Sequence, residues 1–223
     1  MPQGIIFDLD GTLIDSLKDI ALNCNIVLET LGYKTHELND YKNFVGDGAR
    51  ILVQNALPKD ISNEQLEIAL ELFKEVYEKN LHHNTYLYDG IEELLQSLVF
   101  KNYKIAILSN KPHKFTNLYA NKLLPNIPFV DIVGQKEEVP KKPDPFAALQ
   151  IASKFQLAPG DILFIGDTPT DMQTAKNSNM IAVGVAWGFR TQNELINNGA
   201  DYIIQTPAEL LELLNQLSNH SSK

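Results

Sequence analysis

The stretch GIIFDLDGT, at residues 4–12, decides the fold. Its first four residues are small or apolar and show no polar alternation, which is typical of a strand buried on both faces of a sheet. Two carboxylates, Asp8 and Asp10, follow at once. The stretch therefore predicts a buried strand that runs directly into an acidic loop.

Similar short apolar runs recur along the chain, and helical patterns separate them. The runs lie at residues 104–108, 129–133, 162–165, 181–185 and 202–204. Between them, leucine-rich segments such as 91–98 and 210–217 carry the 3.6-residue spacing of helices. Alternating strands and helices predict an α/β fold with a Rossmann-like parallel sheet core and helices on both faces.

A long helical segment interrupts this alternation directly after the first strand. Residues 15–86 carry several helical patterns and no convincing strand, so we expect an inserted all-helical cap there. The predicted α/β core then consists of residues 1–14 and 87–223.

Composition narrows the classes of partner. The chain has 223 residues and a net charge of −9, and an acidic protein is a poor partner for nucleic acid. A single cysteine excludes an internal disulfide and fits a reducing compartment. No window of about 18 apolar residues exists, so no membrane span is expected. The N-terminus lacks a basic signal region, and we predict a cytoplasmic protein.

Polar residues follow three of the predicted strands. They are Asp8, Asp10, Ser109, Asn110, Asp167 and Asp171. The carboxyl ends of parallel strands share one edge of a sheet, and ligands bind at that edge. Lys142 precedes a predicted helix, which places it in a loop on the same edge.

Four aspartates at one edge need opposite charge nearby, because buried carboxylates repel each other. A lysine and a divalent cation supply it, and hard oxygen ligands with room for water and phosphate suit Mg²⁺. The alternative is that each aspartate merely caps a helix. For any one of them that alternative is roughly as good, but for the whole set it is a minority view.

These residues resemble the four motifs of the haloacid dehalogenase superfamily. The similarity lies in DLDGTL at 8–13, Ser109-Asn110, Lys142-Pro143 and Gly166-Asp167 with Asp171, and it covers essentially the whole chain. The helical insertion between the first two motifs also resembles the cap that this superfamily carries at the same place. Within it, residues 44–50 and 187–190 make the chain most similar to phosphoglycolate phosphatases.

The resemblance implies a role for each matching residue. Asp8 is expected to be the nucleophile, and Asp10 is expected to protonate the leaving oxygen and then activate water. The expected phosphate-binding residues are Gly11, Thr12, Ser109 and Asn110, with Lys142 neutralising the phosphate. The expected Mg²⁺ ligands are Asp8, Asp10 through its carbonyl, Asp167 and Asp171, the last in or beside the metal shell. Lys141 competes with Lys142 for the lysine role.

The implied activity is a Mg²⁺-dependent phosphatase that hydrolyses a small phosphate monoester, 2-phosphoglycolate being favoured. A phosphotransferase such as a sugar-phosphate mutase would use the same residues. A non-catalytic phospho-acceptor module also clusters aspartates and a lysine, but such modules are usually about half this length. The expected partner is a small phosphorylated metabolite, and the sequence leaves monomer and homodimer open.

Other reactive residues are assigned no chemistry. Cys24 lies on an apolar helical stripe and is expected to be buried and inert. His82 and His83 have no third metal ligand nearby, so a solvated hinge is favoured. His113 is expected to begin a helix rather than reach the pocket. Residues 46–50 are read equally as a specificity loop and as a helix start.

Overall fold

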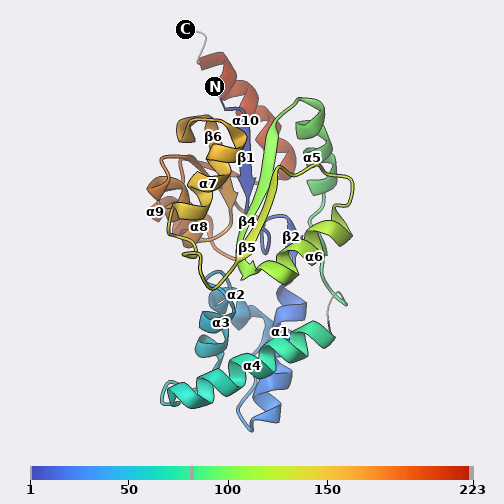
Figure 1. The fold of residues 1–223 in the computed structure, drawn as a ribbon, viewed down its shortest axis with the longest axis vertical. Coiled ribbons are helices and arrows are strands. Elements are labelled where there is room, and N and C mark those ends of the chain that lie inside the picture. The colour runs from blue at the N-terminus through green and yellow to red at the C-terminus, as the bar shows by residue number, and fades with distance from the viewer. Residues whose placement is uncertain (1, 81–82, 221–223) are drawn as a thin grey trace.

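The computed structural model describes residues 2–80 and 83–220, and its centre is a six-stranded sheet in the order β5-β4-β1-β6-β7-β8 (Figure 1). Every pairing in this sheet is parallel. The strands are β1 Gly4–Phe7, β4 Lys104–Pro112, β5 Asp131–Gln135, β6 Ile162–Gly166, β7 Ile181–Val185 and β8 Tyr202–Ile204. The predicted α/β fold is confirmed, with β1 near the middle of the sheet.

One strand is longer than its sequence predicts. β4 continues four residues beyond Leu108, so Ser109 and Asn110 lie within the strand rather than after it. Its pairing with β5 shifts register between Leu108 and Pro112. Sequence analysis ended the strand too early because the apolar run ends at Leu108, whereas hydrogen bonding to the neighbouring strand continues into polar residues.

Alternation along β1 explains why helices cover both faces of the sheet. Ile5 and Phe7 belong to one buried cluster with residues of α5, α6 and α10, and Ile6 belongs to another with residues of α7, α8 and α9. The helices of the first face are α5 Ile91–Phe100, α6 His113–Leu123 and α10 Pro207–His220. Those of the second face are α7 Phe146–Phe155, α8 Pro169–Asn177 and α9 Gln192–Asn197.

Four helices lie together at the carboxyl edge of the sheet, at the bottom of Figure 1. They are α1 Leu17–Thr30, α2 Tyr41–Phe44, α3 Ala49–Ala56 and α4 Asn63–Lys79. They are inserted between β2 Ile14–Asp15 and β3 Tyr86–Leu87, which pair antiparallel. The division into a cap at 15–86 and a core stays a prediction. None of the helices within 2–80 and 83–220 is long and apolar enough to cross a membrane.

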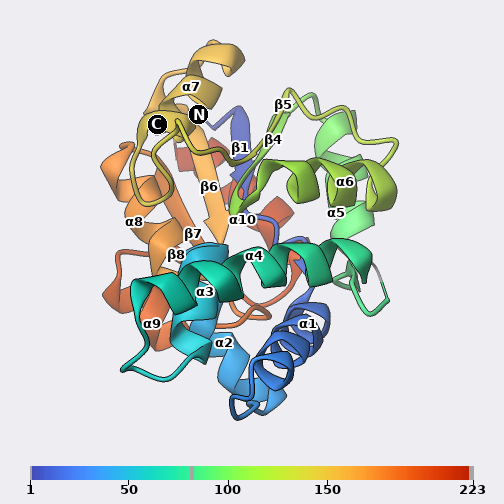
Figure 2. The ribbon, with the colours of Figure 1, turned by 60° about the horizontal axis from the view of Figure 1, so that its bottom comes forward.

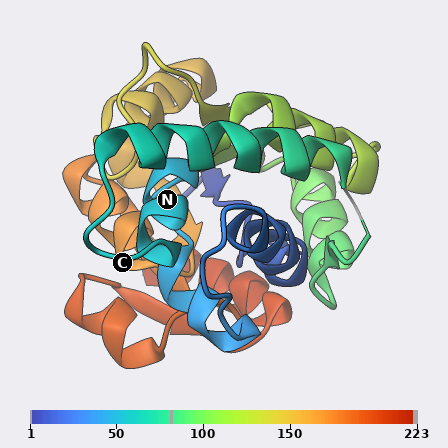
Figure 3. The same ribbon diagram turned by 90° about the horizontal axis from the view of Figure 1, so that it is seen from below.

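The longest of these four helices lies beside a core helix. Seen from below, α4 runs alongside α6 (Figures 2 and 3). Ser62 caps α4 by accepting a hydrogen bond from the Gln65 N–H at 3.2 Å, and the Ser62 N–H donates to Gln65 Oε1 at 2.8 Å. Tyr77 of α4 and Tyr119 of α6 join their hydroxyls at 3.2 Å. This contact fixes one end of α4 over the sheet edge.

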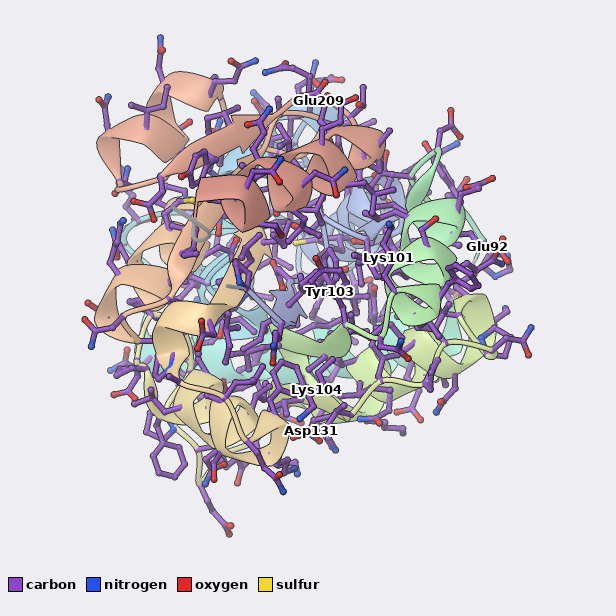
Figure 4. The ribbon with its side chains drawn as sticks, turned by 90° about the horizontal axis from the view of Figure 1, so that it is seen from above. Glu92, Lys101, Tyr103, Lys104, Asp131 and Glu209 are labelled. Atoms are coloured by element: carbon purple, nitrogen blue, oxygen red, sulfur yellow. The ribbon has the colours of Figure 1, made fainter. Side chains whose placement is uncertain are left out.

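Lys104 and Asp131 lie at the opposite edge of the sheet (Figure 4), and both contact α7. Lys104, at the start of β4, donates a hydrogen bond to the carbonyl of Phe155 in α7. Asp131, at the start of β5, pairs with Lys154 of the same helix at 2.5 Å. These contacts fasten α7 to the edge remote from α1–α4.

A buried carboxylate joins α1 to the segment that returns to the core. Asp19 is only 2% exposed. It accepts hydrogen bonds from the Asn84 backbone N–H at 2.9 Å and from the Thr85 hydroxyl at 2.6 Å. Although burial opposes it, these hydrogen bonds lower the pKa of Asp19 below its ordinary value.

We expect Asp19→Asn to lower the free energy of unfolding at pH 7 by about 1–3 kcal/mol, because the amide leaves buried donors without an acceptor. A lowered pKa in the folded state stabilises the protein above the unfolded-state pKa, and this contribution is lost as the pH falls through the folded-state pKa. Urea unfolding should therefore show the difference from wild type narrowing below about pH 4. Replacement of exposed Asp60 by Asn is the control, and equal stability of both variants would contradict the assignment.

Candidate active site

Asp8 lies at the centre of the carboxyl edge of the sheet. Its backbone N–H donates to the carbonyl of Ile165 in β6 at 2.9 Å, so the register of β1 and β6 fixes its position. The residue is 5% exposed. Lys142 Nζ lies 2.9 Å from Asp8 Oδ1, but this buried oxygen has no hydrogen bond of good geometry. An oxygen of this kind retains a lone pair for a ligand.

Three carboxylates meet at this point: those of Asp8, Asp167 and Asp171, with one oxygen of each within 4.8 Å of the others. Only one cation, Lys142, is paired with this cluster in the part of the chain that the structure describes. If all three carboxylates are ionised, the cluster carries an excess of negative charge that a divalent cation would balance. Hard oxygen ligands and the lone pair on Asp8 therefore fit a divalent metal.

Asp167 follows β6 directly, and uncharged hydrogen-bond donors orient its carboxylate. One of its oxygens accepts from the Thr12 hydroxyl at 3.2 Å, and the other accepts from the Phe189 N–H at 2.8 Å. A Cβ on Gly11, whose φ is +83°, would lie 2.2 Å from Asp167 Oδ2. The turn after Asp10 therefore requires glycine for both its backbone angle and its closeness to this carboxylate.

Lys142 contacts the acidic cluster, whereas the ammonium of Lys141 is directed to the loop between α2 and α3. The Lys142 residue is 3% exposed, and its Nζ donates to Asp171 Oδ1 at 2.6 Å. Lys141 Nζ instead donates to the carbonyl of Asp47 at 2.8 Å. Asp171 also accepts from the Thr168 N–H and hydroxyl through Oδ2. Both oxygens of Asp171 are thus engaged, and one of them orients Lys142.

Burial and mutual repulsion change the pKa values of this cluster. Burial, together with the Asp171 charge, raises the pKa of Asp8 to about 7, although Lys142 opposes the shift. Burial and the charges of Asp171 and Asp8 raise the pKa of Asp167 well above its ordinary value. Burial alone would lower the pKa of Lys142, but Asp171 and Asp8 outweigh it and raise that pKa.

Ser109 and Asn110 line a cavity of about 60 Å³ between the sheet edge and α1–α4. Asn110 Nδ2 donates to the carbonyls of Gly46 and Lys142, each at 3.1 Å, and its Oδ1 accepts from the Lys142 N–H at 2.9 Å. Its side chain therefore holds the lysine loop beside β4. Gly11 and Thr12 are not among the residues that line this cavity, because they pack against Asp167 and Trp187.

The carboxylate of Asp10 faces away from the cluster, toward α1 and α4. It accepts from the Ser16 hydroxyl at 2.5 Å and from Lys111 Nζ at 3.0 and 3.1 Å. Lys111 was not identified from the sequence. Lys111 follows Ser109 by two residues, the spacing that shares a face in a strand, but this spacing has meaning only because β4 continues past Leu108, which the sequence did not predict.

The loop between α2 and α3 is held to the core mainly through its backbone carbonyls. Arg190 Nη2 donates to the carbonyl of Val45 at 2.9 Å, Asn110 donates to that of Gly46, and Lys141 donates to that of Asp47. One side-chain contact is added by Thr170, which donates to Asp47 Oδ1 at 2.7 Å. Helix α3 begins at Ala49, so residues 46–50 include a helix start, and Gly46, Gly48 and Ala49 also line the cavity.

Comparison with known proteins places this geometry in a family. The model of the family described as haloacid dehalogenase-like hydrolase matches residues 5–185. The chain belongs to this family. The predicted membership and the prediction of a hydrolase are confirmed.

Two relatives of this haloacid dehalogenase-like hydrolase are named phosphoglycolate phosphatase. That of Vibrio parahaemolyticus is 30% identical over 94% of the chain and 95% of its own length. That of Pseudomonas putida is 32% identical over 97% of the chain and 79% of its own length.

Solved structures share the fold over nearly the whole chain. A predicted phosphoglycolate phosphatase from Haemophilus somnus superposes with a TM-score of 0.88, at 27% identity, over 96% of this chain and 98% of its own. A haloacid dehalogenase-like family protein from Streptococcus pneumoniae superposes with a TM-score of 0.86, at 27% identity, over 96% of this chain and 98% of its own.

The remaining reactive residues of this hydrolase lie outside the cluster. Cys24 is buried, and burial raises the pKa of its thiol to about 11. His113 begins α6, and its ring accepts a hydrogen bond from the Gly134 N–H at 3.2 Å. His83 is exposed, and His82 lies outside the described residues.

The raised pKa of Asp8 predicts a pH-dependent stability in metal-free protein. A carboxylic acid whose pKa rises on folding stabilises the folded state below the unfolded-state pKa, and this stabilisation is lost as the pH rises through the folded-state pKa. Between about pH 4 and 7, metal-free wild type should therefore lose more stability than Asp8→Asn, in which this group cannot titrate.

Urea unfolding of both proteins in the presence of a chelator would measure the difference. Parallel stability profiles for the two proteins would show that Asp8 does not titrate in this range. A saturating divalent cation should reduce the difference, because its charge offsets the ionised carboxylates.

Proposed function

We propose that this haloacid dehalogenase-like hydrolase is a Mg²⁺-dependent phosphatase that acts on a small phosphate monoester, with 2-phosphoglycolate as the favoured substrate. The observation that carries the proposal is the buried Asp8 beside two further carboxylates and Lys142. The two relatives named phosphoglycolate phosphatase support the choice of substrate.

Asp8 is the proposed nucleophile. Its carboxylate oxygen bonds to phosphorus while the bond from phosphorus to the ester oxygen breaks, giving an aspartyl-phosphate and the freed alcohol. Water then attacks the phosphorus, releasing inorganic phosphate and restoring Asp8. The strands on either side fix Asp8, so little reorganisation is needed for in-line attack.

Asp10 is the proposed acid and base. It donates a proton to the leaving ester oxygen and takes one from the water that attacks the intermediate. Its carboxylate lines the cavity on the side of α1 and α4, where Ser16 and Lys111 hold it. Asp10 is thus directed toward the part of the substrate that leaves.

The phosphoryl group would be held by Lys142, Ser109 and the Asn110 N–H. Phosphoryl transfer proceeds through a loose transition state, so catalysis rests mainly on positioning and charge. Asp8, Asp167 and the Asp10 carbonyl would hold Mg²⁺, which when bound supplies positive charge to the phosphoryl oxygens. Asp171, with both oxygens engaged, would act chiefly by holding Lys142.

A small phosphorylated metabolite is the proposed partner. A phosphotransferase or mutase would use the same side chains, so the product distinguishes it from a phosphatase. Cytoplasmic location stays a prediction, and the choice between monomer and homodimer stays open. The long helical segment that closes over the cavity argues against a simple phospho-acceptor module.

We expect Asp8→Asn to lower the turnover of 2-phosphoglycolate by at least about 1,000-fold, because the amide is a poor nucleophile. Release of inorganic phosphate in the presence of Mg²⁺ measures it. Asp60→Asn serves as the control and should keep wild-type turnover. Equal activity in Asp8→Asn and wild type would refute the nucleophile. With a sugar phosphate as substrate instead, accumulation of its isomer rather than inorganic phosphate would favour the mutase.

We expect Asp167→Asn to weaken Mg²⁺ binding by at least about 10-fold, because an amide replaces an anionic ligand. Calorimetric titration of Mg²⁺ into wild type and variant measures the affinity without turnover. The exposed variant Asp60→Asn should bind Mg²⁺ as wild type does. Unchanged affinity in Asp167→Asn would remove this residue from the metal site.

A further inference from the structure

Lys111 is a buried lysine that lines the cavity, and among the described residues it is Lys142, not Lys111, that pairs with the acidic cluster of Asp8 and Asp171. The side chain of Lys111 is also almost fully buried, at 5% exposed, and it lines the cavity beyond Asp10. Burial of an ammonium group removes its hydration, which is costly unless other groups take the place of water. The groups around Lys111 therefore indicate which ligands its charge can bind.

The partners of Lys111 include one anion and aromatic groups. Its Nζ contacts Asp10, donates to the Tyr77 hydroxyl at 2.8 Å, and lies 4.9 and 5.0 Å from the ring centres of Tyr77 and Tyr119. Burial raises the pKa of Tyr77 well above its ordinary value, so its hydroxyl stays neutral. Asp10 is thus the anion paired with Lys111 among the described residues, and when Asp10 carries the proton that its proposed acid role requires, the ammonium presents its charge to the cavity.

The rest of this part of the cavity is apolar. Its walls beside Lys111 include Val45, Leu52, Phe73 and Phe115. Lys74 also lines the cavity, but it is 45% exposed and pairs with Glu71 at 2.6 Å. Among the described residues that line the cavity, Lys111 is thus the buried cation.

The position of Lys111 relative to Asp10 defines which part of a substrate it can reach. Asp10 is the proposed proton donor to the leaving ester oxygen, and Lys111 Nζ lies 3.0 Å from its carboxylate. In 2-phosphoglycolate a single methylene separates the ester oxygen from the carboxylate. A cation adjacent to the proton donor is therefore within reach of that carboxylate.

We propose that Lys111 Nζ and the Tyr77 hydroxyl form a binding subsite for a carboxylate carried by the leaving group of the substrate. This inference rests on the proposed phosphatase function and deepens it. Lys142 recognises the phosphoryl group, and Lys111 recognises the second anionic group across Asp10. The subsite selects phosphorylated hydroxy acids over phosphate esters of neutral alcohols.

The test compares 2-phosphoglycolate with its carboxamide analogue, in which the second anion is replaced by a neutral group of similar shape. Lys111→Met should lower kcat/KM for the carboxylate about 10- to 100-fold more than for the carboxamide, as expected for loss of a charged hydrogen bond. Lys111→Arg retains the charge and should keep most of the preference. Lys114→Met, which removes an exposed charge from α6, should keep all of it.

A merely structural role for Lys111, such as holding Asp10, would lower kcat/KM equally for both substrates, and that result would overturn the subsite. So would a wild-type enzyme that hydrolyses both substrates equally well, although the phosphatase function would then stand. If Lys111→Met fails to fold, as judged by circular dichroism, Lys111→Gln replaces it.

A binding measurement separates the subsite from turnover. Asp8→Asn, titrated calorimetrically in the presence of Mg²⁺, should bind 2-phosphoglycolate about 10- to 100-fold more tightly than the carboxamide, and the additional change Lys111→Met should abolish this preference. Equal binding of both compounds by Asp8→Asn would overturn the subsite. The result holds even if wild type shows no turnover, an outcome that would refute only the proposed function.

Discussion

Repulsion among buried carboxylates at one edge of a parallel sheet is the constraint on which the rest of this structure depends. Asp8, Asp167 and Asp171 are brought together by strands β1 and β6 and the start of α8. The closeness is imposed by backbone hydrogen bonds, which the side chains cannot relax. Lys142 offsets part of the charge through contacts of 2.9 and 2.6 Å. The negative charge that remains unbalanced is what the proposed divalent cation would offset.

The surrounding residues mostly serve this cluster indirectly. Thr12 and the Phe189 N–H aim Asp167, Thr168 and Lys142 occupy both oxygens of Asp171, and Asn110 holds the lysine loop. Because each is a neutral donor or a single cation, the arrangement directs the carboxylates without fully neutralising them. The carboxylates of such a site keep part of their negative charge, which remains available to bind a cation.

The sequence predicted the sheet, the order of its motifs and the helical insertion because these depend on local patterns. Apolar runs mark buried strands, and residues such as Asp8 and Asp167 follow them directly. Lys111 and the true end of β4 escaped prediction for a different reason. Both depend on contacts between distant segments: β4 with β5, and Lys111 with Tyr77 of α4. Nothing in a single stretch of sequence reports which helix will cover the end of a strand.

The loop between α2 and α3 has a consequence for how enzymes of this type can diversify. Arg190, Asn110 and Lys141 all reach carbonyl oxygens of that loop, at Val45, Gly46 and Asp47. Main-chain oxygens are present whatever amino acid occupies the position. The side chains of the loop can therefore be replaced to admit a new substrate while most of the hydrogen bonds between the loop and the α/β core are retained. Substitutions that change substrate specificity can therefore leave most of the hydrogen bonds that hold this loop over the cavity intact.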